Sequence, residues 1–137
     1  MRHARNNVWQ WTLVFAVLGL GAGCGHGNGP QRYNLSGAVT YAGQPVPAGI
    51  IVFEPDDAAG NQGPGTVAEF SGGRYYTPRG RGTVGGPHVV RIIGYTAQPE
   101  GGDDSTGARP LFEEYKTQVD LPQSNASHDF HIPADHR

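Results

Sequence analysis

The sequence predicts an all-β fold, a seven-stranded antiparallel Greek-key β-sandwich, and three observations predict it. The 137 residues include 22 glycines and 11 prolines without a repeat period, which indicates many turns between short elements. Short stretches alternate apolar and polar residues with a period of two, as strands with one buried face do. No long stretch has the period of a helix, so we expect short strands connected as in a sandwich.

The densest pattern covers residues 35–55 and predicts the first two strands. Residues 35–41 alternate in the way that gives a strand one buried and one wet face. Residues 42–45 read A-G-Q-P, a tight turn with a residue free to take positive φ and a proline that donates no amide. The apolar run at 50–53 is the next strand, and residues 54–55 end it.

Two further strands follow a polar loop. Residues 66–70 place Thr, Ala and Phe on one face and Val and Glu on the other. Residues 71–73 form a tight turn into a strand at 74–77. That strand carries Tyr75 and Tyr76 side by side, and one of these two tyrosines must face outward.

The longest apolar stretch of the predicted domain, residues 88–95, is expected to be a central strand. Its alternation allows either His88, Val90 and Ile92, or Arg91 and its neighbours, to face the core. Burying an unpaired arginine costs far more than burying a neutral imidazole. We therefore expect the face that carries His88 to be buried.

The C-terminal part is expected to contain a one-turn helix and two strands. Residues 111–115 read L-F-E-E-Y and permit a single helical turn, which is too short to be stable without packing. Residues 117–121 and 127–132 are the last strands, with Phe130 and Ile132 pointing inward.

The N-terminus has the pattern of an exported lipoprotein. Residues 1–23 combine a short positive leader, an apolar core and small residues, which is typical of a signal peptide. The stretch L-G-A-G-C that ends at Cys24 resembles the lipobox of bacterial lipoproteins, and this resemblance implies lipid attachment at Cys24. Residues 24–32 then form the lipidated cysteine and a flexible tether, and residues 33–137 form the domain. The expected location is the bacterial cell envelope, on its periplasmic face or outer surface.

Four turn and strand motifs carry a resemblance to a family. They are V-T-Y-x-G-x-P-V-P-x-G at 39–49, I-x-F-x-P at 51–55, G-x-Y at 73–75 and G-x-H-x-V-x-I at 86–92. Together they resemble small bacterial lipoproteins with a carboxypeptidase regulatory-like, transthyretin-like domain. The resemblance covers nearly the whole predicted domain and implies a β-sandwich. It implies little about function, because these motifs consist of turn residues and inward aliphatics.

Several activities lack the residues that they require. The net charge of −2 argues against a broad phosphate-binding surface, so we expect no nucleic-acid partner. Transthyretin-like hydrolases use a C-terminal Y-R-G-S segment, whereas this chain ends in P-A-D-H-R. Asp129 and His131 share a strand face, but two ligands make a weak metal site. We therefore expect neither catalysis nor a cofactor.

The leading hypothesis is a non-catalytic, lipid-anchored envelope module with a structural or protein-interaction role. Membrane lipid is its first expected partner, through acylated Cys24, and an envelope protein or glycan is the second. The first alternative is a carbohydrate-binding accessory protein of a polysaccharide-uptake system, and the second is a small hydrolase or metal-binding domain. The candidate partner-binding residues lie in two acidic loops and on exposed aromatic positions: Asp56, Asp57, Tyr76, Tyr95, Asp103 and Asp104.

Overall fold

The computed structural model describes residues 29–97 and 107–136. The predicted signal peptide at 1–23, the predicted lipidation site Cys24 and the acidic residues Asp103 and Asp104 lie outside the described residues. Among the residues described, no helix has the length and apolar character needed to cross a bilayer.

The described chain is all-β, as predicted, and its only helical element is a short 3₁₀ turn. The elements in chain order are β1 (Leu35–Tyr41), β2 (Gln44–Pro45), β3 (Ala48–Pro55), η1 (Asp57–Ala59), β4 (Thr66–Ser71), β5 (Arg74–Tyr76), β6 (Gly86–Tyr95), β7 (Tyr115–Leu121), β8 (Ala126–Ser127) and β9 (Phe130–Ile132). The main strands fall where the alternation predicts them, and their ends differ by one to two residues.

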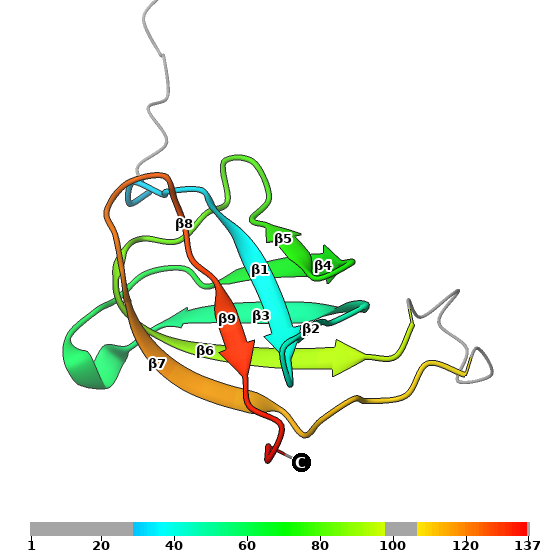
Figure 1. Ribbon diagram of the computed structural model, residues 1–137. Helices are drawn as coiled ribbons and strands as arrows, with labels where there is room; N and C mark the ends of the chain where they lie inside the picture. Colours follow the sequence, from blue (N-terminus) through cyan, green and yellow to red (C-terminus); the bar gives the residue numbers. More distant parts are fainter. Residues whose placement is uncertain (1–28, 98–106, 137) are drawn as a thin grey trace, which may run out of the picture.

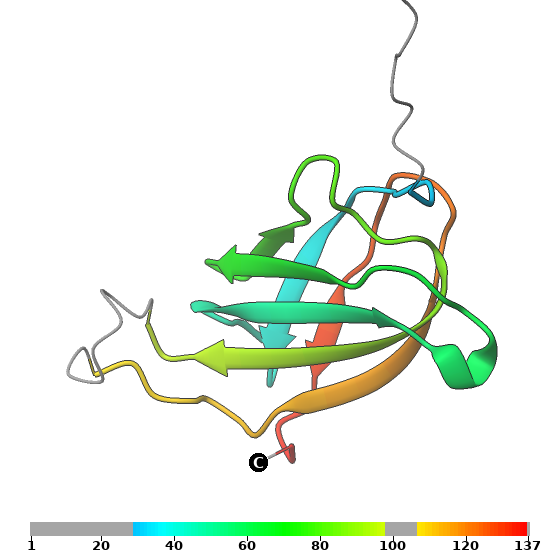
Figure 2. The same ribbon diagram turned by 180° about the vertical axis from the view of Figure 1, so that it is seen from behind.

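The strands form one sheet in the order β2-β1-β5-β4-β3-β6-β7, and every neighbouring pair on this path is antiparallel. Figures 1 and 2 show how this sheet curls into a half-barrel, with β1 running across the direction of β3 and β6. The inner surface of the half-barrel holds the core. The opposite, convex surface is called the outer face below.

The expectation that all strands are antiparallel is wrong for the C-terminal segment. The chain from residue 126 to 132 forms two short strands, β8 and β9, and both pair parallel with β1. Val39 lies beside Phe130 in this register. The parallel arrangement brings Phe130 and Ile132 over the core, where both are buried as predicted. Burial of these two side chains helps to hold the segment beside β1.

The predicted helical turn at 111–115 does not form. The amide of Leu111 instead donates to the carbonyl of Gly94 over 2.9 Å, and Phe112 is buried against the Tyr41 ring with centroids 5.0 Å apart. Five residues gain little from helical hydrogen bonds, so burial of Phe112 decides the conformation.

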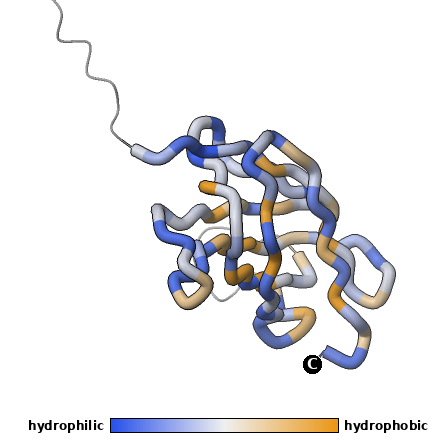
Figure 3. Tube along the Cα trace, turned by 90° about the vertical axis from the view of Figure 1, so that its left-hand side faces the viewer, coloured by the Kyte–Doolittle hydropathy of each residue, from blue (hydrophilic) through white to orange (hydrophobic). Residues whose placement is uncertain are grey.

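The core is built from the inward residues of every long strand, and Figure 3 shows hydrophobic and hydrophilic positions alternating along the chain. Three aromatic rings, those of Phe53, Tyr75 and Phe130, pack together with centroids 5.9 to 6.1 Å apart. His88 is buried, as predicted, and the Arg91 side of β6 faces outward. The choice of the His88 face over the Arg91 face, made on the cost of burying an arginine, is therefore confirmed.

Two tight turns connect neighbouring strands, one between β1 and β2 and one between β4 and β5. Ala42 and Gly43 both have positive φ, 50° and 79°, and Gly72 and Gly73 have φ of 56° and 72°. Positive φ at both central residues is the geometry that matches the twist of two antiparallel strands. The predicted turns at 42–45 and 71–73 are therefore confirmed.

Arg32 joins the N-terminal segment to the domain. Its Nε donates to the carbonyl of Gly82 over 2.7 Å, and its Nη2 donates to Thr66 Oγ1 over 2.8 Å. Tyr33 bridges to Thr83 next to these contacts. Arg32, the last residue of the predicted tether, is thus held against the fold.

Candidate functional site: the outer face of the sheet

Four aliphatic side chains lie together on the outer face, and we call them the apolar strip: Ile50, Val52, Val67 and Ile93. Val52 lies opposite Val67 on β4, and Ile50 lies opposite Ile93 on β6. None of the four belongs to the buried core, and the Val67 residue is 54% exposed. Ile50, Val52 and Ile93 are half-buried, so Val67 is the most exposed member of the strip.

Charged residues flank the apolar strip. The Arg91 guanidinium donates to the Glu54 carboxylate, with Nη2 and Oε1 2.6 Å apart. Arg91 lies opposite Val52, so this ion pair is next to the Val52 end of the strip. Lys116 on β7 lies beside Arg91, and Glu69 on β4 lies beside Ile50. The strip therefore has an apolar centre and a charged rim, the arrangement found in protein interfaces.

Tyr76 is the most exposed large apolar residue of the described chain, at 66%. Its neighbour Tyr75 is fully buried and donates its hydroxyl hydrogen to the His128 carbonyl over 2.7 Å. Strand β5 pairs with both β1 and β4, so the backbone that carries Tyr76 is held on two sides. The fold thus presents the Tyr76 ring from a rigid position.

A hollow lies on each side of the Tyr76 ring, and we call the ring with its two hollows the Tyr76 surface. The first hollow has a volume of about 500 Å³ and is lined by polar residues that include Asn34, Ser36, Arg79 and Asn125. The second, of about 590 Å³, is lined by Glu69, Phe70, Ser71, Arg74 and Tyr76. Both hollows are open depressions of the surface and not enclosed clefts of the kind that buries most of a small ligand.

Tyr95 does not contribute to the Tyr76 surface. It lies at the end of β6, half-buried, beside Ala48 and Pro110. Strands β4 and β3 separate β5 from β6, so three strand spacings of about 4.8 Å place the two backbones roughly 14 Å apart. The two predicted aromatic candidates therefore occupy separate surfaces.

Asp56 is held inside the fold. It is only 9% exposed, and its Oδ1 accepts hydrogen bonds from the amides of Ala58 and Ala59 at the start of η1. Its Oδ2 accepts from Gln118 Nε2 over 3.2 Å. Asp57 is exposed in η1. Of the two acidic residues predicted in this loop, Asp56 therefore caps a turn and Asp57 faces solvent.

Asp129 and His131 each bond to β1. Asp129 Oδ1 accepts from the amide of Ala38 over 2.8 Å, and His131 Nδ1 lies 2.8 Å from Thr40 Oγ1. These contacts help to hold the C-terminal segment beside β1. Across residues 29–97 and 107–136, no group of three or more His, Cys, Asp or Glu residues is arranged to hold a metal ion.

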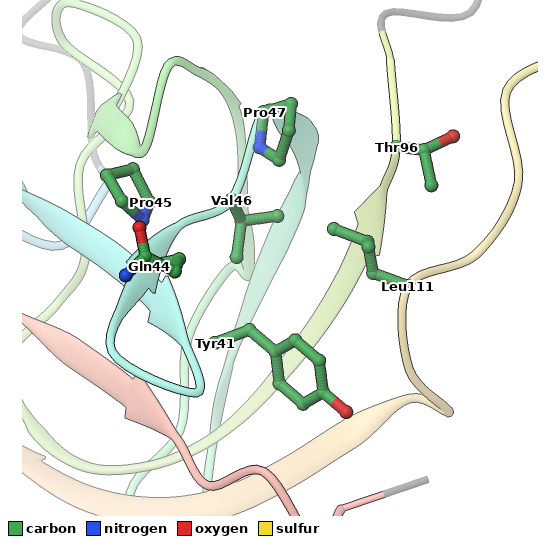
Figure 4. Close-up of a pocket in the computed structure, with 7 residues that line it drawn as sticks. All are labelled: Tyr41, Gln44, Pro45, Val46, Pro47, Thr96 and Leu111. Atoms are coloured by element: carbon green, nitrogen blue, oxygen red, sulfur yellow. The ribbon is translucent and has the colours of Figure 1, made fainter.

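A third hollow, of about 300 Å³, lies at the other end of β1 (Figure 4). The side chains of Tyr41, Val46 and Leu111 converge on it, and Gln44 and Thr96 add polar atoms at its margin. The Tyr41 hydroxyl donates to the Ala134 carbonyl over 3.3 Å. Among the residues of 29–97 and 107–136 that line this hollow, none carries a carboxylate, imidazole or thiol, the groups that act as general acid or base near neutral pH.

The buried titratable groups are also engaged within the fold. His88 Nδ1 lies 2.8 Å from the Gly86 carbonyl, which fixes one ring nitrogen. Burial raises the pKa of the Tyr75 phenol, and the nearby Asp129 carboxylate raises this pKa further. Neither group opens onto one of the three hollows described above.

Comparison with known proteins adds no assignment, because no protein-family profile, curated protein or solved structure matches the chain. The site residues therefore rest on geometry. The sequence pointed to Tyr76 but not to the apolar strip. The available signal was the run of apolar residues at 50–53, which supplies aliphatics to both faces of β3.

Proposed function

We propose that this chain is a non-catalytic, lipid-anchored module of the bacterial cell envelope that binds a protein partner through the apolar strip. In this proposal, residues 1–23 direct export and Cys24 carries the lipid. The domain is a Greek-key β-sandwich of the carboxypeptidase regulatory-like, transthyretin-like kind, as its turn motifs suggest. It faces the periplasm or the outer surface.

The observation that carries the proposal is the exposure of Val67 within the apolar strip. An isolated exposed aliphatic needs no explanation, but Val67 lies directly opposite Val52, and Ile50 and Ile93 continue the same surface. Val67 is 54% exposed, so burying what remains accessible against a partner would contribute about half of the ~1.5–3 kcal/mol that complete burial of a fully exposed side chain gives, roughly 1 kcal/mol. The charged residues Glu54, Arg91 and Lys116 at the rim would fix the orientation of the bound partner.

The interaction is tested by placing a photo-crosslinking amino acid at residue 67 in intact cells. We expect a discrete crosslinked product of defined mass, and none with the same amino acid at exposed residue 123, which lies in the β7–β8 connection. A Val67→Lys variant without the crosslinking amino acid should no longer co-purify with the protein identified in that crosslinked product. Its thermal unfolding midpoint should equal that of the parent. A crosslinking pattern that is the same at residues 67 and 123 would refute the proposal.

The anchor is tested separately with Cys24→Ser. The parent protein should incorporate labelled palmitate and fractionate with membranes, because two acyl chains anchor stably where one is marginal. The variant should lose the label. If the variant stays equally labelled, lipid attachment at Cys24 is wrong, whatever the apolar strip does.

A second candidate function is carbohydrate binding, as an accessory protein of a polysaccharide-uptake system. The exposed Tyr76 ring favours it, because aromatic side chains combine an apolar face with a polar edge. Retention of a polysaccharide that is lost with Tyr76→Ala but kept with Val67→Lys would separate this function from protein binding.

A further inference from the structure

We propose that the Tyr76 surface binds an acidic oligosaccharide, a sugar chain that carries carboxylate or sulfate groups. This inference deepens the carbohydrate-binding candidate by naming the ligand class. It rests on Tyr76, Arg74 and Arg79, none of which belongs to the apolar strip. Protein binding and glycan binding can therefore succeed or fail separately.

The Tyr76 ring provides a stacking platform with open space on both sides. It lines both the hollow of about 500 Å³ and the hollow of about 590 Å³, so the ring stands between them. A single sugar ring can lie on the phenol while the neighbouring units of the chain occupy the two hollows. An aromatic residue on a doubly paired strand loses little conformational freedom when it binds.

Each hollow contains one arginine. Arg79 lines the first hollow and Arg74 lines the second, and both residues are exposed. Within the part of the chain that the structure describes, the one ion pair is Arg91 with Glu54, so neither arginine has a carboxylate within 4.0 Å. Planar guanidinium groups bind carboxylate and sulfate oxygens with two parallel hydrogen bonds.

Neutral polar groups complete the first hollow. The Asn125 Oδ1 atom accepts a hydrogen bond from the backbone amide of Asn34 over 2.8 Å. This bond holds the Asn125 side chain in place and does not use its NH₂ group. The Ser36 hydroxyl and the Asn34 side chain line the same space. Amide and hydroxyl groups around an aromatic platform suit sugar hydroxyls. Among the described residues that line the two hollows, two are arginines and one, Glu69, is acidic. This excess of positive charge favours a negatively charged sugar chain.

The test is affinity electrophoresis of the purified full chain in non-ionic detergent, with polysaccharide in the gel. Polygalacturonate and heparin are the acidic probes, dextran is the neutral probe, and single-stranded DNA is a polyanion whose charges are phosphates. We expect retardation by at least one acidic polysaccharide, and little by dextran or DNA. Raising the salt concentration should weaken it, because the arginines are exposed.

Four variants assign the binding to this surface. Tyr76→Ala should weaken retention about tenfold, the size expected for losing one stacking platform, and Tyr76→Phe should keep most of it. Arg79→Gln should weaken retention several-fold, whereas Arg109→Gln, which removes an equal charge from an exposed residue that lines neither hollow, should not. Thermal unfolding of each variant should match the parent, since these side chains are exposed.

Three outcomes would overturn the inference. The first is no retardation by either acidic polysaccharide, and the second is equal retardation by DNA, which would indicate attraction to any polyanion. The third is equal loss with Arg79→Gln and Arg109→Gln. The crosslink at residue 67 is unaffected by any of these results, so failure here would leave the protein-binding proposal standing.

Discussion

Gly37→Ala is the substitution that most directly tests how the C-terminal segment packs on β1. A methyl group at residue 37 would lie 2.0 Å from the His128 carbonyl oxygen and 2.9 Å from Tyr75 Cε1. Ordinary carbon contacts begin at about 3.4 Å, so the backbone at His128 must move. The same backbone accepts the Tyr75 hydroxyl over 2.7 Å and donates to the Ser36 carbonyl over 2.8 Å.

The cost follows from these contacts. Overpacking of this kind costs about 1–3 kcal/mol, and two lost hydrogen bonds cost about 1 kcal/mol each. We therefore expect Gly37→Ala to lower the free energy of unfolding by about 3–5 kcal/mol, a large share of a typical total of about 5–15 kcal/mol. With an m-value of about 2 kcal/mol per molar urea, the unfolding midpoint should fall by about 2 M.

Urea denaturation followed by tyrosine fluorescence measures this change, and Gly29→Ala is the matched control. No atom of the described residues lies within 4 Å of a methyl group at residue 29, so its midpoint should equal that of the parent. A Gly37→Ala protein that unfolds at the same urea concentration as the control would refute the close packing of His128 on β1.

Two further predictions concern groups buried in the fold. Burial, and then the Asp129 carboxylate, raise the pKa of Tyr75, so the folded state holds this proton more tightly than the unfolded state, whose pKa is about 10. The stability from Tyr75 should be fully present below pH 10 and lost as the pH rises toward the higher folded value. Tyr75→Phe should flatten this alkaline loss in urea denaturation at a series of pH values from 9 to 12, and equal slopes of stability against pH in both proteins would contradict it. Asp56→Ala should lower the free energy of unfolding by about 1 kcal/mol through loss of the η1 cap, whereas Asp56→Asn should retain most of it. Equal melting temperatures for the Ala and Asn variants would show that the cap contributes nothing.

The alternation of apolar and polar residues predicted which side of each long strand is buried. On β9 it placed Phe130 inward, and on β6 it left two possible faces, of which the cost of burying Arg91 selected the one with His88 and Ile92. This works because successive side chains of a strand point to opposite faces, whatever the strand pairs with. The buried face of a strand can therefore be predicted without knowing which strands pair with it.

Pairing partners could not be predicted in this way. Residues 127–132 alternate equally well beside a parallel or an antiparallel neighbour, so the sequence did not indicate that β8 and β9 run parallel with β1. The helical turn expected at 111–115 was wrong for a related reason. Burial of Phe112 against Tyr41 depends on chain that is distant in sequence.

The candidate site shows the same division between local pattern and tertiary packing. The sequence by itself determined that Tyr75 and Tyr76 face opposite ways, because adjacent residues of a strand must. It did not determine which of them is exposed. The register with β1 and β4 placed Gly37 and Phe70 beside Tyr75, which left room for one ring in the core and turned Tyr76 to solvent between Arg74 and Arg79.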